Sequence, residues 1–135
     1  MPYNLFISHS WKYSDDYNRL VEKLKDYSYF TFRNYSVPSK DPLDISGKNY
    51  EAKLRRAIED QMRQCSVVLV IAGKYVSYSD SIEMELDIAK EMEKPILAIE
   101  PWGSEATSQR AKNVASEVVG WNSTSIVDAI RRLSI

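Results

Sequence analysis

The sequence predicts an α/β domain built on one parallel sheet with helices on both faces. Three nearly continuous apolar runs, Tyr3–Ile7, Ser66–Ala72 and Pro95–Ile99, are typical of strands that are covered on both sides. Segments with apolar residues at helical spacing separate these runs, so strand and helix alternate along the chain. This alternation predicts a doubly wound sheet with right-handed crossovers.

The remaining elements complete a sheet of five strands. Two further runs with a weaker apolar pattern, Tyr29–Tyr35 and Glu117–Trp121, are the remaining candidate strands. The helical patterns cover Tyr17–Leu24, Tyr50–Met62, Ser81–Glu93 and Ser125–Leu133, with a short helix possible at Gln109–Asn113. Ser125 and Asp128 have the spacing of a capping box, which predicts that the last helix opens there.

Length and charge narrow the function classes. A chain of 135 residues with 44% hydrophobic residues fits one folded domain, residues 1–135. The net charge is −1 and the charges are dispersed, so no basic stripe for nucleic acid is present. No basic leader precedes an apolar stretch, and the run Val67–Ala72 is too short to span a bilayer. We therefore expect a cytoplasmic protein without nucleic-acid or membrane partners.

The single cysteine, Cys65, cannot form an internal disulfide, which agrees with a reducing compartment. It lies where a helix should lead into a buried strand. An inert core thiol is therefore favoured over a reactive one.

Ligands of open parallel sheets bind beyond the carboxyl ends of the strands, where the strand order reverses. The segments that follow the predicted strands are Ser8–Trp11, Arg33–Asn34, Gly73–Ser81 and Glu100–Gly103. The irregular stretch Ser36–Asn49 is long for such a fold and is the candidate lid.

One carboxylate lacks a local explanation. Asp80 and Glu83 suit a helix cap and its capping box, but Glu85 projects between Ile82 and Met92, on the apolar side of the predicted helix. A carboxylate there costs several kcal/mol unless it is paired or hydrated. A cleft would hydrate it, and the helix N-terminus would favour its ionised form. The alternative is a structural carboxylate paired with a cation such as Arg33 or Lys48.

Several segments together resemble TIR domains. Leu5–Ser8 resembles their first strand, and Gly47–Val68 resembles the stretch from the BB loop to the third strand. Ser81–Leu86 matches a TIR hexad that ends in Trp-Cys-x-x-Glu-Leu, with the Glu-Leu pair retained and the Trp and Cys replaced. The ending Ser116–Asn122 is similar to TIR-like domains of the prokaryotic Thoeris anti-phage defence type, the ThsB-like TIR family.

The resemblance implies a flavodoxin-like three-layer sandwich with strand order 2-1-3-4-5. It also implies that Glu85 is the catalytic residue of an enzyme whose substrate is NAD, with no further cofactor. Thoeris TIR proteins convert the ADP-ribose product into a small signal, typically a cyclic isomer, that activates a separate effector protein. The lost Trp and Cys affect local packing and product choice, whereas the carboxylate is retained.

One carboxylate suffices for NAD because the cationic nicotinamide departs as a neutral molecule and needs no general acid, unlike the leaving group of a glycosidase. His9 is the single histidine, so a metal site built on histidines is excluded. The side chains that we expect to contact substrate, through stacking, hydroxyl or cationic groups, are Phe6, Ser8, His9, Ser10, Trp11, Arg33, Asn34, Lys48 and Ser81. Core packing for Phe6, hydrogen bonding at a strand end for His9 and solvated charge for the two cations remain alternatives.

The same residues bear on other functions. A phospho-accepting receiver needs acids after the first strand, where this chain has Ser8-His9-Ser10, and no glycine-rich phosphate loop is present. A nucleoside deoxyribosyltransferase-like enzyme would also use a glutamate but would form a covalent ribosyl intermediate. A non-enzymatic TIR scaffold would act by homotypic assembly through the Ser36–Asn49 loop, so a homo-oligomer remains open.

Overall fold

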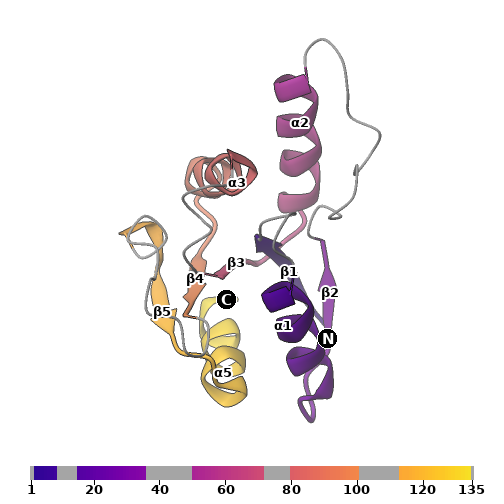
Figure 1. Ribbon diagram of the computed structural model, residues 1–135, viewed down its shortest axis with the longest axis vertical. Helices are drawn as coiled ribbons and strands as arrows, with labels where there is room; N and C mark the ends of the chain where they lie inside the picture. The colour runs from indigo at the N-terminus through magenta and orange to yellow at the C-terminus, as the bar shows by residue number, and fades with distance from the viewer. Residues whose placement is uncertain (1, 9–14, 36–49, 72–79, 101–112, 135) are drawn as a thin grey trace.

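The computed structural model describes residues 2–8, 15–35, 50–71, 80–100 and 113–134 (Figure 1). Its five strands form one sheet in the order β2-β1-β3-β4-β5, and every neighbouring pair is parallel. The strands are β1 (Tyr3–Ser8), β2 (Phe32–Asn34), β3 (Val67–Ile71), β4 (Ile96–Ile99) and β5 (Glu117–Val119). The predicted α/β sandwich and its strand order are confirmed.

Within the described residues, four helices cover the sheet, two on each face. They are α1 (Asp15–Asp26), α2 (Tyr50–Met62), α3 (Asp80–Glu91) and α5 (Ser123–Leu133). Figure 1 shows α2 and α3 on one side of the sheet and α1 and α5 on the other. None of the helices within the described ranges has both the length and the apolar character needed to cross a bilayer.

The central strand β3 explains why its sequence is apolar without alternation. Val68 and Val70 pack toward α2 and α3, whereas Val67, Leu69 and Ile71 pack toward α1 and α5. Every residue of the strand is buried, because helices cover both faces of the sheet. The sheet therefore separates two cores, and a side chain's position along its strand determines which core it enters.

The outer elements differ from their predicted bounds. Strand β2 spans three residues instead of seven, because the chain turns at Tyr29, which has a left-handed φ of 59° and is 99% exposed. Strand β5 ends at Val119, before Trp121. The stretch Ser36–Asn49 lies outside the described residues. The same holds for the predicted short helix Gln109–Asn113, except for its last residue, Asn113.

The predicted start of the last helix was wrong. Helix α5 begins at Ser123, and the Asn122 side chain caps it by accepting a 3.0 Å hydrogen bond from the Ser125 backbone N–H. Asparagine is as good an N-cap as serine, so both residues offered a start in the sequence. Asn122, which lies nearer than Ser125 to the end of β5, forms the cap.

Candidate active site at the carboxyl end of β1

The order in which the chain adds strands to the sheet reverses between β1 and β3. The chain leaves β1 to reach β2 on one side, and it then returns to β3 on the other side. Ser8, the last residue of β1, lies level with Val70 of β3. The carboxyl ends of these strands form the switch point at which open α/β sheets bind ligands.

Glu85 lies on the sheet-facing side of α3. Its helical neighbours Ile82, Leu86 and Ala89 are buried in the core between α3 and the sheet, and Glu85 itself is only 2% exposed. Asp87 lies on the opposite, exposed side of the helix. The orientation that helical spacing predicts for Glu85 is therefore confirmed.

Burial dominates the protonation of Glu85. Desolvation raises the pKa of its carboxyl from 4.5 to about 8, and the nearby Ser8 hydroxyl acts in the opposite direction. The expected stabilisation of the ionised form by the helix N-terminus does not prevail. Glu85 is the sixth residue of α3, and the dipole effect falls off within the first turn. In the free protein at pH 7 the carboxyl is mainly protonated.

No charged partner compensates this burial within the described ranges. On the adjacent helix, Arg55 of α2 pairs with Glu59 and with Glu91 near the end of α3. The alternative partner Arg33 is exposed and forms no ion pair with Glu85, and Lys48 lies outside the described residues. Glu85 is therefore not a structural half of an ion pair in the described part of the chain.

Two polar side chains of the described residues fall in the buried class, and they are Ser8 and Glu85. Ser8 Oγ and Glu85 Oε2 are both inaccessible to water and make no hydrogen bond of regular geometry. The Ser8 hydroxyl still lies close enough to affect the pKa of the carboxyl. Buried polar atoms without partners are uncommon in folded proteins, and each one calls for an explanation.

The comparison with protein families agrees with this geometry. Residues 6–106 match the family described as Thoeris protein ThsB, TIR-like domain. The chain belongs to this family. The matched range includes β1, α3 and thus Glu85. A search of curated proteins found no match.

The TIR-like domain brings some of the predicted contact residues close to Glu85 and leaves others apart. Phe6 is fully buried in the core beneath α2 and α3, which is the packing role that the sequence left open. Asn34 donates a 2.7 Å hydrogen bond to the Tyr17 hydroxyl of α1, on the other face of the sheet. Among the described contact residues, Ser8 is the one whose side chain lies close enough to Glu85 to affect the pKa of its carboxyl.

Arg33 lies on the same sheet face as Glu85 but toward the other end of β1. It is level with Asn4, four residues before Ser8, which corresponds to about 13 Å along the strand. Ser81 belongs to α3, but its side chain is not described. Four expected contacts lie outside the described residues and stay predictions: His9, Ser10, Trp11 and Lys48.

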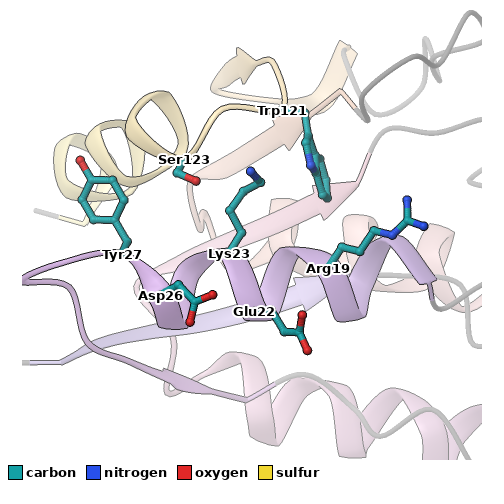
Figure 2. A pocket seen from close by; sticks show the side chains of 7 residues that line it. All are labelled: Arg19, Glu22, Lys23, Asp26, Tyr27, Trp121 and Ser123. Atoms are coloured by element: carbon teal, nitrogen blue, oxygen red, sulfur yellow. The ribbon is translucent and has the colours of Figure 1, made fainter.

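A separate groove of about 490 Å³ lies between α1 and the start of α5 (Figure 2). Lys23 Nζ lies 5.9 Å from the centre of the Trp121 ring, as Figure 2 shows for these two side chains. The groove is lined by Arg19, Glu22, Lys23, Asp26, Tyr27, Trp121 and Ser123. The described lining contains two cations and two carboxylates, all from α1, so it has no excess of positive charge for a diphosphate. The groove also lies on the opposite face from Glu85.

Cys65 is the inert core thiol that the sequence favours. It is buried at the end of α2, and its thiol donates to the Gln61 carbonyl oxygen at 3.4 Å. Desolvation raises its pKa to about 12, although the Lys94 ammonium acts to lower it. A thiol with so little thiolate at neutral pH is a poor nucleophile.

Proposed function

We propose that this TIR-like domain cleaves NAD, with Glu85 as the catalytic carboxylate, and that its product is a cyclic ADP-ribose-type signal in anti-phage defence. The supporting observation is the buried Glu85 carboxyl at the switch point of the sheet, without a charged partner among the described residues. Such a group is costly for folding, and strongly perturbed carboxyls concentrate at functional sites.

The chemistry needs a single carboxylate. The bond between the ribose C1′ and the nicotinamide nitrogen breaks, and its electron pair stays on the nitrogen, so nicotinamide leaves as a neutral molecule. The positive charge that develops on the ribose is stabilised by the ionised Glu85. Water then attacks C1′ to give ADP-ribose, or another nucleophilic atom of the same ADP-ribose attacks to give a cyclic product, and a proton is released in either case.

Substrate binding supplies the reason for Glu85 to ionise. The nicotinamide ring of NAD carries a positive charge, and a nearby opposite charge lowers the pKa of a buried carboxyl. The free protein therefore holds a protonated carboxyl, and the complex with NAD holds a carboxylate. A dry site then strengthens the attraction between this carboxylate and the developing ribosyl cation.

The product links the domain to a partner. We propose that the small nucleotide diffuses to a separate effector protein, so that the two proteins need no direct contact. Exclusion of water from the intermediate favours cyclisation over hydrolysis. Ser36–Asn49 remains the candidate lid for this purpose.

The test is incubation of the purified full chain with NAD, followed by separation of products by mass spectrometry. Glu85→Gln should release nicotinamide at least about 100-fold more slowly than the wild type. The matched control is Asp87→Asn, which makes the same change at an exposed position of the same helix and should keep the wild-type rate. Parallel samples receive extract from phage-infected cells to supply any activator.

Each alternative function gives a different result. Equal nicotinamide release by the wild type and Glu85→Gln would remove Glu85 from the mechanism. A ribosyl adduct on the intact protein, with deoxynucleosides as substrates and NAD untouched, would indicate a deoxyribosyltransferase. Full anti-phage protection by Glu85→Gln in cells would indicate a scaffold.

A further inference from the structure

Ser8 and Glu85 form a buried polar pair that ordinary core packing does not explain. Ser8 is fully buried at the end of β1, and Phe6, two residues earlier, packs into the core beneath α2 and α3. Because side chains alternate along a strand, Ser8 faces the same core. Glu85 enters that core from α3, which contacts β1.

We propose that Ser8 is a positioning residue whose hydroxyl donates a hydrogen bond to the ionised Glu85 carboxylate. The bond holds one carboxylate oxygen in place and leaves the other for the ribose of the substrate. This role differs from direct contact between Ser8 and the substrate. It rests on the proposed NAD cleavage for its catalytic meaning, whereas the hydrogen bond itself is a property of the protein alone.

Ionisation of Glu85 would strengthen a hydrogen bond that Ser8 Oγ and Glu85 Oε2 do not form with regular geometry in the described part of the free protein. With its pKa at about 8, the Glu85 carboxyl is mainly neutral at pH 7, and a neutral acceptor gains less from the Ser8 hydroxyl than a carboxylate does. Leaving two buried polar atoms unbonded costs stability. Ionisation of Glu85 lets one bond satisfy both Ser8 Oγ and a carboxylate oxygen.

No other described group competes for this role. The described charged side chains on the two helices that cover this core are Lys53, Arg55, Arg56, Glu59 and Asp60 of α2 and Glu83, Asp87, Lys90 and Glu91 of α3. The strands and their ends add Arg33 of β2, Lys94 before β4 and Glu100 after β4. None of them contributes to the raised pKa of Glu85, whose causes are burial and, in the opposite direction, Ser8. The strand residues facing this core from β3 and β4 are apolar.

The test titrates Glu85 directly. Carboxyl ¹³C NMR of the full chain, with the Glu85 signal assigned by its absence in Glu85→Gln, gives the midpoint of its titration. Ser8→Ala should move the midpoint upward by about one pH unit, since it removes the hydrogen bond that favours the carboxylate. Ser8→Thr keeps a hydroxyl and should restore the wild-type midpoint. Ser8→Cys, with a weaker donor, should lie between them.

The pH dependence of NAD cleavage gives the second readout. For Ser8→Ala, the rise of kcat/KM with pH should shift upward by the same interval, and kcat at the alkaline plateau should recover toward the wild-type value. Identical NMR midpoints in the wild type, Ser8→Ala and Ser8→Cys would overturn the proposal. A loss of activity that is equal at every pH, with no change of midpoint, would assign Ser8 a purely structural or substrate-binding role.

The two proposals fail separately. If the midpoint depends on Ser8 but no nicotinamide appears even with extract from infected cells, the hydrogen bond stands and NAD cleavage fails. If nicotinamide release depends on Glu85 but the Ser8 variants do not change the midpoint of the Glu85 titration, NAD cleavage stands and the positioning role fails. Ser8→Thr and Ser8→Cys keep the test decisive should Ser8→Ala not fold.

Discussion

At the scale of single residues, Glu85 has opposite effects on stability and on the proposed activity. Burial keeps its carboxyl protonated in the free protein, and any condition that ionises it without a compensating cation destabilises the fold. The same desolvation makes the carboxylate a strong stabiliser of positive charge once substrate is bound. Stability lost at this position is thus the expected cost of the proposed catalysis.

The first prediction concerns the pH dependence of stability. The pKa of Glu85 is about 8 in the folded protein and near 4.5 in the unfolded chain, so its stabilising contribution is complete below pH 4.5 and is lost as the pH rises to about 8. Glu85→Gln lacks this loss. It should match the wild type at pH 4.5 and be more stable at pH 8.5 by a few kcal/mol, since one pKa unit corresponds to about 1.4 kcal/mol.

Thermal denaturation at the two pH values measures this difference. The melting temperature of Glu85→Gln should exceed that of the wild type by roughly 10–20 °C at pH 8.5 and by little at pH 4.5. Asp87→Asn, at an exposed position, provides the control and should show no such change with pH. A constant difference between Glu85→Gln and the wild type at both pH values would mean that the pKa of Glu85 is the same in the folded and the unfolded protein.

The sequence predicted the position of Glu85 but not its protonation. Helical spacing from Ile82 to Leu86 was enough to place the carboxyl on the buried side of α3. Its pKa depends on how completely neighbouring elements exclude water, and that is a property of the assembled fold. The pairing with Ser8 was hidden for the same reason, because the two residues are 77 positions apart and meet only when α3 packs on β1.

At the scale of elements, the buried strands and helices followed their sequence patterns closely, whereas the edges did not. Strand β3 has a continuous apolar run and helix α2 has apolar residues at helical spacing, and their observed bounds differ little from the prediction. Strand β2 pairs with a single neighbour, β1. Its ends depend on the pairing register and on the geometry of the adjoining turn, and local propensity determines neither of them. The start of α5 depended on which of two capping residues the preceding strand brought into place.

The cap of α5 gives the second prediction. Asn122→Ala removes the acceptor for the Ser125 backbone N–H and should lower the free energy of unfolding by about 1 kcal/mol. Asn122→Asp keeps an acceptor and should stay close to the wild type. Urea denaturation followed by circular dichroism measures both. Thr124→Ala, at an exposed position of the same helix, is the control; an equal loss in Asn122→Asp would argue against the cap.

At the scale of the whole molecule, the sheet separates two faces with different roles. The core beneath α2 and α3 contains Ser8 and Glu85, and the core beneath α1 and α5 contains no buried polar side chain among the described residues. The groove beside Trp121 belongs to the second face. It joins residues from both ends of the chain, so no local pattern could reveal it.

The third prediction tests this separation. Arg19→Ala and Lys23→Ala change the groove beside Trp121, on the face opposite Glu85, and should leave kcat/KM for NAD within about two-fold of the wild type. The measurement is the initial rate of nicotinamide release at low NAD concentration. A loss of ten-fold or more in either variant, with normal folding, would show that the groove takes part in NAD cleavage.

The most direct measurement of the role of Glu85 is the ratio of kcat/KM for NAD between the wild type and Glu85→Gln from pH 6 to pH 9.5. Because kcat/KM reports ionisation in the free enzyme, the ratio should rise about ten-fold per pH unit below pH 8 and then level off above it. A ratio near one at every pH would contradict catalysis by the Glu85 carboxylate.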